Sequence, residues 1–323
     1  MKKLAITAGD PGGIGPEVVL KAVPVVSREC LPIIIGNSAI IEEARSLSGV
    51  SIKIKKIRDV GEACPATDTL WCLDPDSGGV FKKCETAAEN GIAAVQCIKK
   101  GVALALEKKV DALVTAPISK EALHLAGFPW PGHTEMLGEL TGTKEYAMML
   151  VGGPLKVILV TIHTSLRSVP GLVTKKSVLR AVRLAKKASE MLGIDRPRIG
   201  VAGLNPHAGE SGMLGTEEKE EIAPAVEAAA GEGIAAEGPY PPDTIFHKAY
   251  NGGVDIVVCM YHDQGLIPLK MIAFEKGVNV TVGLPIIRTS PDHGTAYDIA
   301  WKGIADPSSM IEAIRLAVRL RLS

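Results

Sequence analysis

Short apolar runs alternate along the chain with longer stretches in which apolar residues recur at helical spacing. The short runs are rich in Val and Ile and are bounded by Gly, Pro or Asn, which is typical of strands. Because they are continuously apolar rather than alternating, they favour parallel strands covered on both faces. Strands are therefore expected at residues 3–9, 31–37, 111–117, 156–163, 198–207, 255–263 and 277–285.

The longer stretches between these runs predict helices. The segment 174–193 is the clearest, because it combines a 3.6-residue apolar period with Thr174 as an N-cap and Gly193 at its end. Alternating strands and helices predict an α/β fold with mainly parallel sheets. The proline-dense segment 238–246 is expected to be a rigid loop. Helices are expected at residues 15–28, 86–109, 174–193, 216–231 and 306–321.

The length of 323 residues is sufficient for two domains of ordinary size. We expect two α/β/α domains. The first is expected to be discontinuous, with residues 1–130 plus 280–323. The second is expected at residues 131–279 and would carry most of the metal and substrate ligands considered below.

Charge and composition exclude several classes of partner. The chain has 36 basic and 36 acidic residues and only 4% aromatic residues, so neither nucleic acid nor an anionic membrane is an expected partner. No apolar run approaches the roughly 20 residues that span a bilayer. The start "MKKLAITAGD" lacks the apolar region of a secretory signal, so a cytoplasmic protein is expected. The six cysteines form no CxxC pair, which argues against a zinc ribbon.

Three histidines follow predicted strands: His163, His207 and His262. Ligands of open α/β sheets bind beyond the carboxyl ends of the strands, so these imidazoles can converge there. Three imidazoles suit a divalent metal, and among zinc, cobalt, magnesium and manganese they favour zinc or cobalt. The alternative for each is a hydrogen-bonding residue of a loop. Asp263 could orient an imidazole, take a proton or simply cap the loop.

A second set of residues is suited to an anion. His133 and Thr134 lie just before a helix-like stretch, where backbone N–H groups favour phosphate, although His133 could be incidental to an N-cap. Lys270, Asn279 and Arg288 could bind phosphate or carboxylate, the alternative being solvated side chains. His293, in the turn 290–296, could cap or line the same site.

The glycine-rich segment 7–22 lies between a predicted strand and a predicted helix. It contains no GxGxxG, and no GK[ST] follows it, so it is neither a Rossmann fingerprint nor a P-loop. A dinucleotide, if used, must therefore bind by another scheme.

Several long motifs make the chain resemble the 4-phosphohydroxy-L-threonine dehydrogenase (4-hydroxythreonine-4-phosphate dehydrogenase) family of vitamin B6 synthesis. The resemblance covers nearly the whole chain except about residues 40–85. The motifs are "GDPGGIGPE", "TAPISKEAL", "GHTE", "TIHTSLR", "GLNPHAGESG", "MYHDQGLIPLK" and "GVNVTVGLPIIRTSPDHGTA".

This resemblance implies roles for individual residues. It implies a fold like that of isocitrate and isopropylmalate dehydrogenases, with the active site in the cleft between domains and NAD(P) bound without the usual glycines. It also implies a homodimer with a shared active site, in which His262 comes from the neighbouring chain. Asp243 and Asp263 would line the site. The implied metal ligands are His163, His207 and His262, and the implied substrate ligands are His133, Thr134, Lys270, Asn279 and Arg288.

The resemblance implies oxidation of 4-phosphohydroxy-L-threonine at C3, dependent on NAD or NADP and on a divalent metal. The 3-keto acid product would decarboxylate to 3-amino-2-oxopropyl phosphate, a step towards pyridoxine 5'-phosphate. Asp263 and Lys270 are the candidate catalytic residues, with Asp263 as the candidate base. Similar dehydrogenases act on 4-phospho-D-threonate, 4-phospho-D-erythronate or an aromatic dihydrodiol. A metal-dependent hydrolase or aldolase could be built on the same histidines, and a non-catalytic phosphosugar-binding regulator is a third possibility.

Overall fold

The computed structural model describes residues 1–76 and 78–322, which form two compact units. Unit 1 comprises residues 1–144 and Leu284–Leu320, and unit 2 comprises Glu145–Gly283 with Arg321 and Leu322. Unit 1 is discontinuous in sequence. Residues 131–144, which we expected in the second domain, belong to unit 1, and residues 280–283 belong to unit 2.

Unit 1 is built on a parallel sheet with the strand order β3-β4-β2-β1-β5-β12. The expected strands at 3–9, 31–37 and 111–117 are confirmed as β1, β2 and β5. All three are continuously buried beyond their first residue, as the uninterrupted apolar runs indicate. The strands are β1 (Lys3–Thr7), β2 (Leu31–Ile35), β3 (Lys53–Ile57), β4 (Thr69–Leu73), β5 (Ala112–Thr115) and β12 (Arg288–Pro291).

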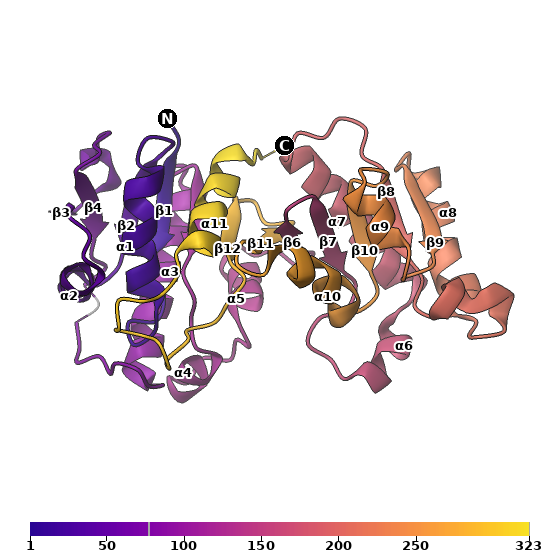
Figure 1. The fold of residues 1–323 in the computed structure, drawn as a ribbon, viewed down its shortest axis with the longest axis horizontal. Coiled ribbons are helices and arrows are strands. Elements are labelled where there is room, and N and C mark those ends of the chain that lie inside the picture. The colour runs from indigo at the N-terminus through magenta and orange to yellow at the C-terminus, as the bar shows by residue number, and fades with distance from the viewer. Residues whose placement is uncertain (77, 323) are drawn as a thin grey trace. The chain divides into compact units, whose positions relative to one another are not determined.

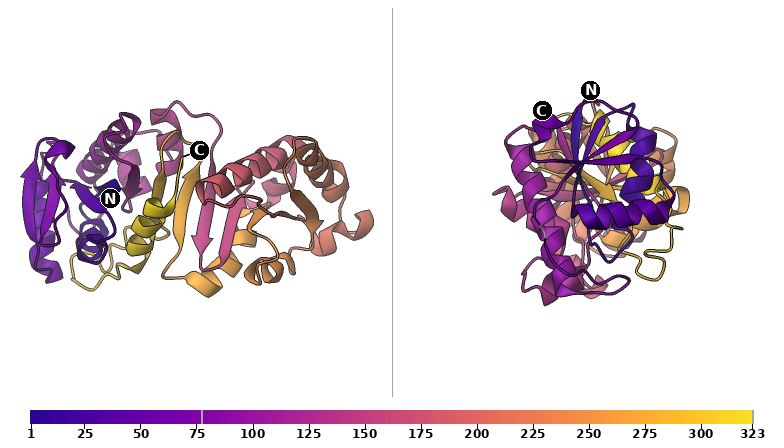
Figure 2. Two further views of the ribbon diagram at one scale, coloured as in Figure 1. Left: turned by 90° about the horizontal axis from the view of Figure 1, so that it is seen from above. Right: turned by 90° about the vertical axis from the view of Figure 1, so that its left-hand side faces the viewer.

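Helices cover both faces of this sheet. Helix α3 lies on one face, and α1 and α11 lie side by side on the other (Figure 2, left). The expected helices at 15–28, 86–109 and 306–321 are confirmed as α1, α3 and α11. The helices of unit 1 are α1 (Gly15–Val26), α2 (Ser38–Ser48), α3 (Ala88–Leu106), α4 (Lys120–Leu125), α5 (His133–Leu140) and α11 (Ser308–Arg319), with a short 3₁₀ turn η1 (Val60–Glu62).

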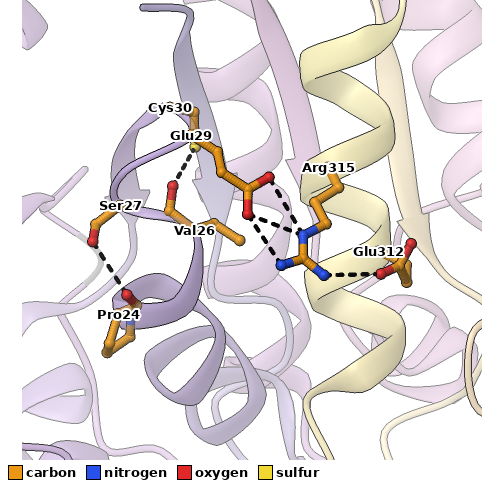
Figure 3. A network of polar contacts seen from close by, with 7 residues as sticks. All are labelled: Pro24, Val26, Ser27, Glu29, Cys30, Glu312 and Arg315. Carbon is orange, nitrogen blue, oxygen red and sulfur yellow. Dashed lines mark hydrogen bonds and ion pairs between the residues drawn. The ribbon is translucent and has the colours of Figure 1, made fainter.

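The last helix of unit 1, α11, is joined to the first by both packing and charge. Its apolar residues Met310, Ala313 and Ile314 are fully buried. At the surface, Arg315 donates from Nε and Nη2 to Glu29, which follows α1, with both N–O distances 3.1 Å (Figure 3). Because such half-exposed ion pairs contribute only about 0–1 kcal/mol, the buried apolar side supplies most of the attachment.

The strands of unit 2 follow the order β11-β6-β7-β10-β8-β9 (Figure 1). Its pairs are parallel from β7 to β9 and antiparallel between β11 and β6 and between β6 and β7. The expected strands at 156–163, 198–207, 255–263 and 277–285 are confirmed. The strands are β6 (Ala147–Gly152), β7 (Leu155–Leu159), β8 (Ile199–Ala202), β9 (Ala236–Tyr240), β10 (Ile256–Cys259) and β11 (Val278–Val282).

Helices also cover both faces of the strands of unit 2, with α7 and α8 on one side and α9 and α10 on the other (Figure 2, left). The expected helix at 174–193 is confirmed as α7. Thr174 is its N-cap, as expected, because Thr174 Oγ1 accepts a hydrogen bond from Ser177 N. The expected helix at 216–231 is a π turn, η4 (Glu218–Ile222), followed by α8. The helices are α6 (Val169–Leu172), α7 (Lys175–Met191), α8 (Ala223–Gly231), α9 (Ile245–Tyr250) and α10 (His262–Ala273), with short turns η2 (Leu166–Ser168) and η3 (Pro206–Gly212).

The segment 238–246 is not simply the rigid loop that we expected. Its first residues belong to strand β9, and its last two begin helix α9. Strand β9 is at the end of the strand order, where Pro239 can be accommodated because one side of an edge strand needs no ladder hydrogen bond. In the described part of the chain, no helix is long and apolar enough to cross a membrane.

Candidate active site

His163 and His262 lie beside each other at the carboxyl ends of two neighbouring strands. Strands β7 and β10 are parallel and in register at Leu159 and Cys259. Beyond this register, Thr161 donates to the carbonyl of Met260 from both its N–H (3.2 Å) and its hydroxyl (2.8 Å). The two strand extensions are therefore tied together, and the ring centroids of His163 and His262 are 6.1 Å apart.

A carboxylate orients one of these imidazoles. Nδ1 of His262 lies 2.7 Å from Oδ1 of Asp263. This contact favours the tautomer that carries its proton on Nδ1 and leaves the Nε2 lone pair available to a cation. His262 is the first residue of α10, and the side chain of Asp263 is 72% exposed. Asp263 is thus placed to orient His262.

The two imidazoles and Asp263 open onto one cavity of unit 2. The cavity has a volume of about 360 Å³, and most of its other lining side chains are apolar. Such a combination of apolar walls with a few polar groups is typical of small-molecule sites. The lining residues are Ile162, His163, Thr164, Leu166, Val169, Tyr261, His262 and Asp263.

Gln264 fixes the backbone next to this cavity, a role that the sequence analysis missed. Its side chain is buried, its Oε1 accepts a hydrogen bond from Met260 N (2.7 Å), and its Nε2 donates to Gly203 O (2.8 Å). Gln264 therefore links the ends of strands β10 and β8. The only signal in the sequence is its position directly after the His–Asp pair.

His207 lies apart from any complete metal-binding cluster in this chain. It is an exposed residue of η3, where its backbone is left-handed with φ 51°. Among the described residues, no three His, Cys, Asp or Glu side chains form a group that could hold a metal ion. The single chain thus pairs two of the three predicted imidazoles and does not add the third to them.

In unit 1, His133 and Thr134 occupy the first turn of helix α5. Nε2 of His133 is buried and has no hydrogen-bond partner among the described residues. Burial holds the pKa of His133 well below its usual value, and the positive charge of Arg288 lowers this pKa further. His133 is therefore a neutral imidazole at pH 7. A buried polar atom without a partner is expected to face a ligand or water.

Arg288, the first residue of β12, is fully buried in unit 1. Its Nη2 and Nε donate to Thr115 Oγ1 at 2.7 and 3.2 Å. Burial lowers the pKa of Arg288 to about 9. Because this shift reflects the cost of the buried charge, an anion beside the guanidinium would be stabilised. Thr115 was not among the predicted site residues.

The remaining predicted residues differ in their surroundings. Two of them have a buried polar atom that lacks a hydrogen-bond partner among the described residues. These atoms are Oδ1 of Asn279, on β11, and Nε2 of His293, after β12. Lys270 on α10 has its Nζ 5.7 Å from the ring centroid of Phe274. Asp243 is exposed in the turn before α9. The unsatisfied atoms of Asn279 and His293 suit a ligand-facing position, as in His133.

The glycine-rich segment of unit 1 encloses a carboxylate instead of phosphate. Asp10 is buried, and its two oxygens accept hydrogen bonds from Gly12 N (2.8 Å) and the Tyr297 hydroxyl (2.7 Å). Burial raises the pKa of Asp10, although these hydrogen bonds oppose that rise. The backbone N–H of Gly12 already donates to the Asp10 carboxylate, so it is not available to a phosphate. The segment therefore lacks the character of a phosphate-binding loop.

Known proteins resemble the chain over nearly its whole length. The family described as "Pyridoxal phosphate biosynthetic protein PdxA" matches residues 28–317. The 4-hydroxythreonine-4-phosphate dehydrogenase of Sulfurihydrogenibium sp. (strain YO3AOP1) is 46% identical over 326 residues, which cover 99% of each chain. The D-threonate 4-phosphate dehydrogenase of Cupriavidus necator is 47% identical over 324 residues, covering 98% of this chain and 96% of that protein.

Solved structures agree with these matches. The crystal structure of 4-hydroxythreonine-4-phosphate dehydrogenase from Klebsiella pneumoniae is 43% identical, with a TM-score of 0.92 over 98% of this chain and 97% of that one. A β-decarboxylating dehydrogenase from Thermococcus kodakarensis shares the fold at 17% identity, with a TM-score of 0.50 over 96% of this chain and 81% of that one. The expected fold class is confirmed.

Proposed function

The chain belongs to the family of the pyridoxal phosphate biosynthetic protein PdxA, and from this membership we propose that it oxidises 4-phosphohydroxy-L-threonine at C3. The secondary alcohol loses a hydride to NAD(P)⁺ and a proton to a base. The resulting 3-keto acid loses CO₂ and gives 3-amino-2-oxopropyl phosphate. The observation that carries this proposal is the cavity that holds His163, His262 and Asp263 together.

A second substrate is favoured by one specific relative. The Cupriavidus necator protein named D-threonate 4-phosphate dehydrogenase is 47% identical to this chain, as similar as the relatives named for hydroxythreonine. Both names describe a phosphorylated hydroxy acid. We therefore keep 4-phospho-D-threonate, and with it 4-phospho-D-erythronate, as the alternative substrates.

The imidazole pair fits a divalent metal. His262 is oriented by Asp263, and His163 lies beside it, so two nitrogen ligands are available in one chain. We propose His207 as the third ligand. Three imidazoles suit zinc or cobalt, with magnesium and manganese as less favoured metals. When bound, such a cation would lower the pKa of the substrate hydroxyl.

Substrate binding is assigned to the residues suited to an anion. Arg288 offers a buried guanidinium, and neutral His133 can hydrogen-bond a phosphate oxygen. Thr134, Lys270 and Asn279 complete the proposed set, and His293 and Asp243 are proposed to line the site. Fixing the phosphate and carboxylate with these groups would hold C3 in a single orientation.

Asp263 and Lys270 are the two proposed catalytic residues. The hydrogen bond from His262 supports an orienting role for Asp263, and the exposure of its side chain also leaves it accessible to a substrate proton. Lys270 lies two helical turns further along α10. Their roles can be separated, because an orienting residue affects metal affinity whereas a base affects turnover of the metal-loaded enzyme.

We propose that the protein is a homodimer that shares its active sites. Helix α10, which begins at His262, exposes the apolar side chains of Ile267 (60%) and Met271 (81%), and Phe274 just beyond it is 77% exposed. Apolar side chains clustered on one helix are typical of an interface. A second copy of the chain is the partner that the family resemblance implies.

A substrate panel tests the function. Purified protein is mixed with 4-phosphohydroxy-L-threonine, 4-phospho-D-threonate or 4-phospho-D-erythronate, each with NAD⁺ or NADP⁺, and absorbance at 340 nm is followed. We expect reduction with the first substrate, loss of activity with a chelator, and recovery with zinc or cobalt. Product formation without reduction of NAD(P)⁺ would instead support a hydrolase or aldolase. Tight binding without turnover would support a regulator.

A further inference from the structure

The segment that carries His207 has an unusual backbone. Five consecutive residues, His207 to Ser211, have positive φ values between 42° and 80°, and only Gly209 among them is a glycine. A left-handed conformation costs roughly 1–2 kcal/mol per non-glycine residue. Such a turn persists only when its surroundings determine it.

The carboxylate of Glu218 determines where this turn begins. Its Oε1 accepts hydrogen bonds from the backbone N–H groups of Leu204 (2.8 Å) and Asn205 (2.7 Å). Its Oε2 accepts a third from Asn205 Nδ2 (3.0 Å). The carbonyl of Asn205 in turn accepts from Ala208 N (3.2 Å). Glu218 thus holds the backbone N–H groups of both residues that precede Pro206, and Glu217 Oε2 shares the Asn205 side-chain amide at 2.8 Å.

The turn also packs directly against this carboxylate. A Cβ added to Gly209 would lie 2.6 Å from Glu218 Oε2, so the backbone of the turn is in close contact with the acid. Glu218 is only 3% exposed and is the first residue of the π turn η4. Burying a carboxylate is costly unless hydrogen bonds compensate, and π turns are frequent at functional sites.

We propose that Glu218 is a positioning residue that presets His207 to bind the divalent metal. Glu218 need not touch the metal or the substrate. It holds the start of a strained turn, and the turn presents the His207 imidazole outward. This inference rests on the proposed metal-dependent function. If the inference holds, the metal site depends on Glu218, which lies 11 positions after His207 and on a different element.

The test measures metal affinity instead of activity alone. Metal-free protein is titrated with Zn²⁺ by calorimetry for wild type, Glu218→Gln, His207→Ala and the double variant. Glu220→Gln is the matched control, because Glu220 lies exposed on the same π turn. We expect Glu218→Gln to weaken Zn²⁺ binding roughly 10- to 100-fold, as for other residues that orient a ligand, and Glu220→Gln to leave it unchanged.

The double variant separates positioning from a general structural effect. If Glu218 acts through His207, Glu218→Gln should not weaken Zn²⁺ binding further once His207 is alanine. Additive losses, or wild-type affinity in a folded Glu218→Gln protein, would overturn the inference. If Zn²⁺ binds wild type and His207→Ala equally, the proposed role of His207 fails instead.

A measurement without metal tests directly whether Glu218 controls the conformation of the His207 turn. The His207 imidazole resonance, assigned by its loss in His207→Ala, reports the conformation of the turn in the metal-free protein. We expect a shifted or broadened resonance in Glu218→Gln and an unchanged one in Glu220→Gln. If Glu218→Gln does not fold, Asn205→Ser provides a second test, because it removes the side-chain bonds to Glu218 Oε2 and Glu217 Oε2 and keeps the backbone bonds to Glu218 Oε1. An unchanged resonance in both Glu218→Gln and Asn205→Ser would contradict the proposal.

Discussion

The hydroxyl of Tyr297 donates to Oδ2 of Asp10 at 2.7 Å, so a residue near the end of the chain holds the buried acid of the first loop. Burial raises the pKa of Asp10 above its unfolded value, and the Tyr297 hydrogen bond opposes this rise. An acid with a raised folded pKa stabilises the fold at low pH, and this contribution is lost as the pH rises through the folded pKa.

Tyr297→Phe should therefore destabilise the protein more at pH 7 than at acidic pH. Removing the hydroxyl leaves the ionised carboxylate one donor short, at a cost of about 1–3 kcal/mol, whereas protonated Asp10 loses less. Urea unfolding at pH 7 and at pH 4.5 measures the difference. A loss of equal size at both pH values would show that the hydroxyl does not stabilise the ionised form of Asp10.

Arg288→Lys should weaken binding of the phosphorylated substrate. Lysine cannot reproduce the planar guanidinium that also bonds Thr115. Loss of a charge-assisted hydrogen bond of about 1.5–3 kcal/mol predicts a KM raised roughly 10- to 150-fold. In wild type, KM should also rise as the pH passes about 9, where the pKa of Arg288 lies. Unchanged KM in Arg288→Lys would remove this residue from the substrate site.

His133 should make the fold sensitive to acid. Its folded pKa is held below the unfolded value by burial and by Arg288, so the unfolded state binds a proton first as the pH falls. The stability cost is absent above about pH 6.5 and grows below it, up to about 1.4 kcal/mol per pH unit. His133→Gln should therefore lose less stability than wild type between pH 7 and pH 5. Urea unfolding checks this, with exposed His124→Gln as the control.

Asp263→Asn should weaken Zn²⁺ binding roughly 10- to 100-fold if Asp263 orients His262. Lys270→Ala should leave Zn²⁺ binding unchanged and lower turnover of the metal-loaded enzyme. Calorimetry of metal-free protein and steady-state kinetics at saturating Zn²⁺ measure the two effects. If Asp263→Asn binds Zn²⁺ normally yet loses turnover that saturating metal cannot restore, Asp263 is the base instead.

Mixed dimers should show whether His163 and His262 of one metal site come from different chains. In a shared site, a dimer of one His163→Ala and one His262→Ala subunit contains one intact site. Random mixing of the two inactive variants should then restore about a quarter of wild-type activity. If both ligands come from the same chain, as their 6.1 Å separation allows, mixing should restore none.

Much of the fold could be predicted because the apolar runs are strong signals. All seven predicted strands and all five predicted helices are present. Helix α10 was not predicted, since Pro268 lies inside it and the preceding run reads as a strand end. Strand β9 was missed for a similar reason, because its Gly–Pro sequence is typical of a loop and is tolerated at the edge of the sheet.

The candidate site could be predicted only in part. Histidines after strands were visible in the sequence, but the neighbouring positions of β7 and β10, which bring His163 to His262, depend on tertiary contacts. Thr115, Gln264 and Glu218 were missed because each acts on a residue or backbone group remote in sequence. Thr115, for example, meets Arg288 from 173 positions away. Common polar residues carry no local signal of such contacts.

The discontinuous unit 1 has a consequence for synthesis on the ribosome. Strand β5 pairs with β1 on one side and β12 on the other, but β12 and α11 are translated only after residues 145–283 of unit 2. Until they emerge, the nascent chain presents an open strand edge and an uncovered apolar flank, both of which invite aggregation. A chain shortened just before residue 284 would keep this defect permanently, so a nonsense mutation there should yield insoluble protein even though all three candidate imidazoles of unit 2 are intact.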